Sequence, residues 1–163
     1  MKICLIWGLV LAIAYVLETA LLPIVHFYGI GIDLLLLLTS SFALLKGERL
    51  GGLFGFMAGL LQDLASGSFF GTNILSKMLL GYVLGIASTR VFKEKIFLPV
   101  MAAIAATFFN YFILALLVLL LGYRFDLLQH LRMVLVPMLI YNVVAASPVH
   151  FFVCWLCKRV KEK

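Results

Sequence analysis

The sequence predicts an all-α integral membrane protein, with six transmembrane helices in one compact bundle and both termini in the cytoplasm. Of its 163 residues, 65% are apolar and 12% are charged, against about 45–50% and about 25% in a soluble domain. Long apolar runs recur from end to end, and short basic clusters lie between them. A soluble globule is therefore excluded, and residues 1–163 are expected to form a single membrane domain.

The apolar runs are continuous rather than alternating, which favours helices over the strands of a membrane barrel. The expected helices are Ile3–Leu22, Ile32–Leu45, Leu50–Ala65, Thr72–Val91, Phe97–Leu121 and Leu131–Leu156. At about 1.5 Å per residue, the second and third helices are short for about 30 Å of hydrocarbon. The first resembles a secretory signal, but its apolar run is too long for a signal core.

Basic residues set the orientation of the predicted helices. Of the 13 lysines and arginines, Lys77 lies inside the fourth helix, and only Arg124 and Arg132 fall on the side opposite the termini. The other ten lie on the same side as the termini. The positive-inside rule therefore predicts that both termini of this multi-pass protein are cytoplasmic. The net charge of +6 is explained by topology, and no nucleic-acid partner is expected.

No group of residues indicates catalysis, a metal site or a cofactor. The sequence contains no phosphate-binding Gly-x-x-x-x-Gly-Lys, no Gly-x-Ser-x-Gly, and no serine or cysteine with an evident base partner. The three histidines are not interpreted as a metal pattern. Cys154 and Cys157 form a Cys-x-x-Cys near a helix end, where packing is the favoured interpretation. We therefore expect a protein that is not an enzyme.

Ionisable and amide side chains inside the spans are the candidate binding residues. Charged groups at membrane depth are unfavourable, so they usually face the bundle or a watery cavity. The outer half of the predicted bundle contains Glu18, Asp33, Asp63 and Lys77, while Asn110 and Asn142 lie near mid-span. One hypothesis pairs Lys77 with Asp63; the alternative is that Lys77 extends to the outer headgroups while Asp63 caps a helix end.

Small residues mark a turn and a helix contact. Ser66, Gly67 and Gly71 lie in a turn between the third and fourth helices, where the backbone amides of the fourth helix could receive an anionic group or simply form a sharp turn. Small residues four positions apart let helices approach closely, either within the protein or with a partner. Such spacings occur at Gly51, Gly55 and Gly59 in the third helix and at Gly81 and Gly85 in the fourth.

These residues resemble those of a known family. The stretch 51–71, a glycine-rich helix ending in Asp63 and followed by a Ser-Gly turn, is similar to the signature of the rod shape-determining protein MreD family. The run that starts at Asp33, the Glu18-Thr19-Ala20 stretch and the basic tail 158–161 also resemble it. The resemblance implies a fold related to the substrate-binding components of energy-coupling-factor transporters.

The resemblance also implies a non-enzymatic subunit of the bacterial elongation complex, a multi-pass protein of the inner (cytoplasmic) membrane that scaffolds or regulates lateral peptidoglycan synthesis. The implied direct partner is a bitopic MreC-like protein. Indirect partners are the MreB filament, the RodA glycosyltransferase and a class B penicillin-binding transpeptidase. Two alternatives remain open from the sequence: a solute-binding component of a vitamin transporter, with the outer polar residues as its pocket, and a protein that presents or flips a lipid-linked wall precursor.

Overall fold

The computed structural model describes residues 2–20, 31–66, 70–91, 98–122 and 131–161. Within these ranges the chain forms six α-helices and no β-strand. The helices are α1 (Lys2–Ala20), α2 (Leu34–Lys46), α3 (Glu48–Ser66), α4 (Thr72–Val91), α5 (Leu98–Leu120) and α7 (Val136–Lys161), and a π-helical segment, Leu131–Leu135, leads into α7. Each begins and ends within about five residues of the position that the hydropathy pattern predicts, because each helix coincides with one of the predicted apolar runs.

The short helix α2 is the centre of the bundle. It contacts α1, α3, α4, α5 and α7, and its residues 35–43 are all buried. Its hydroxyl groups bond to its own backbone: Thr39 donates to the carbonyl of Leu35 and Ser40 to that of Leu37. A helix that is apolar all round is stable only when neighbouring helices cover it. This cover explains how a helix of only 13 residues is stable here.

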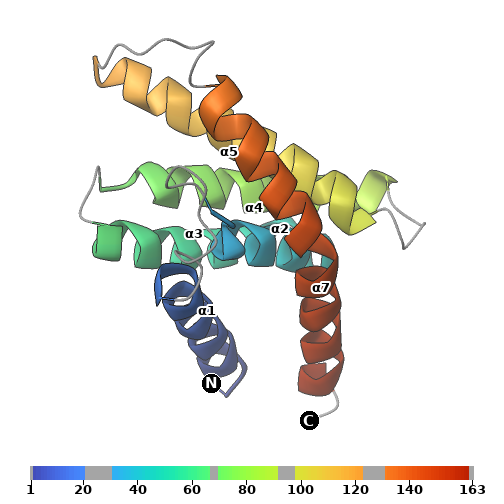
Figure 1. The fold of residues 1–163 in the computed structure, drawn as a ribbon. Helices are drawn as coiled ribbons and strands as arrows, with labels where there is room; N and C mark the ends of the chain where they lie inside the picture. The colour runs from blue at the N-terminus through green and yellow to red at the C-terminus, as the bar shows by residue number, and fades with distance from the viewer. Residues whose placement is uncertain (1, 21–30, 67–69, 92–97, 123–130, 162–163) are drawn as a thin grey trace.

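Figure 1 shows α2, α3 and α4 stacked together, with α5 on one side of the stack and α1 and the C-terminal part of α7 on the other. The helix α1 packs on these helices through Trp7, whose ring lies edge-on to Phe42 of α2 and Phe54 of α3, with ring centroids 4.6 and 5.6 Å apart.

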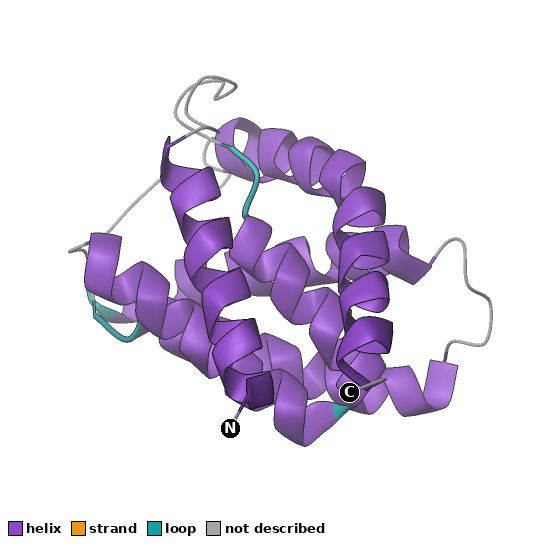
Figure 2. Ribbon diagram, turned by 90° about the horizontal axis from the view of Figure 1, so that it is seen from below, coloured by secondary structure: helices purple, strands orange, loops and turns teal. Residues whose placement is uncertain are grey.

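The N- and C-termini lie on the same side of the molecule in Figures 1 and 2. The helix α7 changes direction partway along (Figure 1), and Pro148 in its interior explains the bend because proline lacks the helical N–H.

The tightest contact joins α3 and α4, where glycines of each helix meet the backbone of the other. A Cβ added at Gly55 would lie 2.1 Å from the carbonyl oxygen of Lys77, and one added at Gly59 would lie 2.4 Å from that of Asn73. Gly51, Gly81 and Gly85 lie in equally close contacts. The spaced glycines predicted from the sequence therefore line an internal contact, with α3 against α4.

Two described helices, α5 and the Leu131–Val160 stretch that includes α7, are long and apolar enough to cross a membrane. The helices Leu5–Ala20 and Leu34–Lys46 are apolar but shorter. Large apolar side chains are exposed on these elements, among them Leu5 and Leu120, at 72% and 75%, and Phe151, at 76%. An outer surface of this kind suits lipid rather than water.

Candidate functional site

Lys77 is fully buried and forms an ion pair with Asp33. Its Nζ donates to Asp33 Oδ2 at 2.7 Å, and the lysine side chain has 0% exposure. The other carboxylate oxygen of Asp33 accepts from the N–H of Leu36 at 2.8 Å, so Asp33 is also the N-cap of α2. This geometry corrects both predictions for Lys77: it neither pairs with Asp63 nor extends to the headgroups. The sequence could not reveal the partner, because Asp33 lies 44 residues away along the chain.

Asp63 caps the start of α4 from the neighbouring helix α3. Its Oδ2 accepts from the N–H groups of Gly71 and Ile74 at 2.8 and 3.1 Å. Its Oδ1 accepts from the N–H and the side-chain amide of Asn73 at 3.2 and 2.9 Å. The carboxylate itself therefore occupies the amide-lined helix start that could have received an external anion. Asp63 is 3% exposed, and a cap contributed by another helix is not visible in local sequence.

The turn itself is only partly described. Ser66 is the last residue of α3, and Gly71 begins the turn into α4 with a φ of 101°. That backbone angle favours glycine. Gly67 lies outside the described residues. Of these three predicted residues, Gly71 is the one whose contact with Asp63 the structure describes.

Glu18 connects α1 to two other helices. Its Oε2 accepts from the N–H of Leu35 at 3.2 Å, and its Oε1 accepts from Gln62 Nε2 of α3 at 3.2 Å. It also lies close enough to Asp33 and Lys77 to interact electrostatically with both. Asp33 is therefore the carboxylate bonded to the Lys77 ammonium group, Glu18 lies near this pair, and each of the two acids also accepts a backbone N–H.

Asn142 extends this group of polar residues into α5 and α7. Its Oδ1 accepts from the N–H of Asp33 at 3.1 Å, and its Nδ2 donates to Thr107 Oγ1 at 3.0 Å. The Thr107 hydroxyl in turn donates to the carbonyl of Ala103 at 2.7 Å. Asn142 and Thr107 are both 0% exposed. The backbone of α2 is thereby held to α7, and α7 to α5.

We call Glu18, Asp33, Gln62, Lys77, Thr107 and Asn142 the polar cluster. Each of the six described α-helices supplies one member, with Asp33 as the cap of α2. Asn110 is also buried and accepts a hydrogen bond from Ser76, which is not a member of the cluster. The sequence pattern does not single out Gln62, Ser76 or Thr107, although Thr107 stands three residues before Asn110 and hence on the same face of α5.

Two polar atoms among the described residues are buried without a hydrogen-bond partner, Gln62 Oε1 and His150 Nδ1. The other ring nitrogen of His150 lies 3.5 Å from Cys154 Sγ, one turn further along α7. Two such groups do not form a metal site, and no group of three His, Cys, Asp or Glu in the described parts of the chain could hold a metal ion. The other two histidines, His26 and His130, lie outside the described residues.

The fold and the polar cluster together define an all-helical membrane protein in which Glu18, Asp33 and Lys77 lie near one another inside the bundle. The family model for the rod shape-determining protein MreD matches residues 2–160. The chain therefore belongs to the MreD family of rod shape-determining membrane proteins. Comparison with curated proteins and with solved structures gave no match.

Proposed function

We propose that this protein is a non-enzymatic subunit of the bacterial elongation complex that scaffolds or regulates lateral peptidoglycan synthesis by binding a bitopic MreC-like protein. Through that partner it reaches the MreB filament, the RodA glycosyltransferase and a class B penicillin-binding transpeptidase. Membership of the MreD family supports a role in rod shape. The binding partners are the part of the proposal that requires experiment.

The proposal places residues 1–163 in the inner membrane as one domain of six spans, with both termini in the cytoplasm. The ten basic residues on the side of the termini support this orientation. Glu18, Asp33, Asp63 and Lys77 then lie in the outer half of the bilayer.

The observation that carries the proposal is that all six described helices contribute to one polar cluster whose members bond mainly to one another. Buried hydrogen-bonded groups fix the arrangement of helices, which suits a protein that presents a defined surface to partners. A solute-binding component needs unpaired polar groups that face a cavity. In the polar cluster the Lys77 ammonium is bound by Asp33 and both Asn142 amide atoms are engaged, while Gln62 Oε1 is the one buried polar side-chain atom of the cluster's described members without a hydrogen-bond partner. The scaffold is therefore favoured over the vitamin-transport alternative.

Capture of the bitopic partner tests this proposal. The tagged protein is purified from membranes of its native host, and the amount of MreC-like protein recovered is compared with that recovered by Arg132→Gln, a variant of an exposed residue outside the polar cluster. We expect the wild type and this control to recover equal amounts of the MreC-like protein. Lys77→Met should recover less of it, in proportion to the amount of the variant that no longer folds. Absence of the bitopic partner from wild-type preparations would contradict the proposal.

A further inference from the structure

A wholly apolar groove of about 340 Å³ lies between α1, the start of α2 and the middle of α7. Ile13, Ala14 and Leu17 form its α1 side, and Val149 and Phe152 form its α7 side. No residue of the polar cluster lines this groove, so the groove and the cluster are separate features. Lipid hydrocarbon is the medium that an apolar groove of a membrane protein meets.

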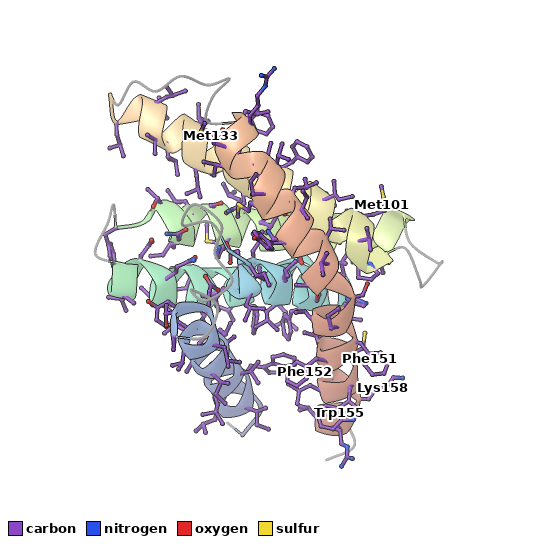
Figure 3. All side chains as sticks on the ribbon, in the orientation of Figure 1. Met101, Met133, Phe151, Phe152, Trp155 and Lys158 are labelled. Atoms are coloured by element: carbon purple, nitrogen blue, oxygen red, sulfur yellow. The ribbon has the colours of Figure 1, made fainter. Side chains whose placement is uncertain are left out.

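A continuous line of side chains leads from this groove to a basic helix end. Phe152, in the wall of the groove, stacks on Trp155 with ring centroids 6.3 Å apart. The guanidinium carbon of Arg159 lies 5.3 Å from the centroid of the Trp155 ring. In Figure 3, Phe152 and Trp155 project from the side of α7 that faces α1, whereas Phe151 and Lys158 project from the other side. Tryptophan is the residue typical of the headgroup level, and arginine binds phosphate.

The side chains that line the groove indicate which kind of molecule it suits. Helices that dock in a membrane favour small residues at the contact, whereas Ile13, Leu17 and Phe152 are bulky and Ala14 is the only small side chain among the lining residues. A single hydrocarbon chain is thin and flexible enough to enter.

We propose that the α1–α7 groove binds one acyl chain of an anionic phospholipid, whose phosphate is bound by Arg159. The apolar groove and the cation match the two ends of such a lipid, and Trp155 lies between them. The lipid would fill the gap between α1 and α7, two helices that are each held mainly by α2 and its neighbours. The proposal is independent of the bitopic partner and of the polar cluster.

The two tryptophans of the chain allow a direct test. Trp7 is 7% exposed in the core, whereas Trp155 is 48% exposed beside the groove. In a Trp7→Phe background, Trp155 fluorescence reports contact with lipid chains. The protein is placed in phosphatidylcholine vesicles containing a small, fixed fraction of bromine-labelled lipid with either a phosphatidylglycerol or a phosphatidylcholine headgroup. We expect the brominated phosphatidylglycerol to bind about fivefold more strongly, the preference that one basic side chain gives.

Three further variants separate the two ends of the lipid. Arg159→Gln should abolish the headgroup preference, and Arg132→Gln, which removes the same charge at the other end of the α7 region, should keep it. Ala14→Leu, which narrows the groove, should reduce quenching by both lipids. Equal binding of the two lipids to the parent protein, or an unchanged preference in Arg159→Gln, would overturn the proposal. The proposal would also be overturned if Ala14→Leu reduced capture of the bitopic partner and left lipid quenching unchanged, because the groove would then hold a partner helix.

Discussion

Lys77 and Asp33 join α4 to the N-cap of α2 through an ion pair of 2.7 Å, with the lysine fully buried. Both charges lie within the bundle, where a lone charge is strongly unfavourable. Asn142 accepts a hydrogen bond from the backbone N–H of the same aspartate. Asp33 therefore joins the central helix α2 to α4 through its side chain and to α7 through its backbone N–H.

Replacing one member of this ion pair should be more harmful than replacing both. Lys77→Met leaves the Asp33 carboxylate buried without a cation, and a loss of about 3–5 kcal/mol in unfolding free energy is expected. Adding Asp33→Asn should restore most of that loss, because asparagine has no charge and can still cap α2. Thermal unfolding of the purified proteins in detergent measures the difference. A double variant no more stable than Lys77→Met would show that the charge is not the cause.

Asp63 should act through the start of α4. Asp63→Ala removes the acceptor of four hydrogen bonds, so we expect a loss of at least about 2 kcal/mol, the upper end for one helix cap. Asp63→Asn keeps one acceptor oxygen and should lose less. The melting temperatures of the two variants provide the comparison. If Asp63→Ala instead melts like the wild type but no longer captures the bitopic partner, Asp63 contacts that partner directly.

The α3–α4 contact predicts opposite outcomes for two neighbouring glycines. Gly55→Ala would place a Cβ 2.1 Å from the Lys77 carbonyl, and separating the two backbones should lower stability by about 1–3 kcal/mol. At Gly52 the nearest atom, Cβ of Tyr82, would be 3.6 Å away, so Gly52→Ala should be neutral or slightly stabilising. Expression level and melting temperature measure both. Equal behaviour of the two variants would mean that the helices do not meet at Gly55.

The proposed orientation places the two ends of α3 on opposite sides of the membrane. In a protein whose three native cysteines are replaced by serine, Phe70→Cys should react with a membrane-impermeant maleimide in intact cells. Arg49→Cys, at the other end of α3, should react only after the cells are permeabilised. Both native side chains are exposed, Phe70 at 67%. The reverse labelling pattern would invert the topology.

The helices could be predicted from the sequence because each coincides with an apolar run. Hydropathy is a property of residues that are consecutive in the chain, so it can be assessed without knowing how the helices pack. The glycines of α3 and α4 were also recognisable by their spacing, and the structure places them between these two helices. Glu18, Asp33, Lys77 and Asn142 stand out in the sequence because few charged or amide side chains occur in the apolar runs. The structure places them near one another inside the bundle, and their role in binding a partner or ligand stays a prediction.

The partners of these residues could not be predicted. Lys77 bonds across 44 positions and Asn142 across 109, so the pairs depend on how the helices pack. Asp63 lies nearer to Lys77 in sequence, but its oxygens are taken by the amides of the next helix. Gln62 and Thr107 are ordinary polar residues in sequence, and only the packing of α3 and α5 brings them to the cluster.

Cell shape during depletion of this protein in its native host tests the central claim most directly. The ratio of cell length to width is measured by microscopy as the protein is withdrawn, with and without wild-type protein supplied from a second copy. If the protein is a subunit of the rod complex, we expect depleted cells to widen and become round, and cells that carry the second copy to stay rod-shaped. Cells that stay rod-shaped after depletion but require an added vitamin would contradict the scaffold role and favour solute transport.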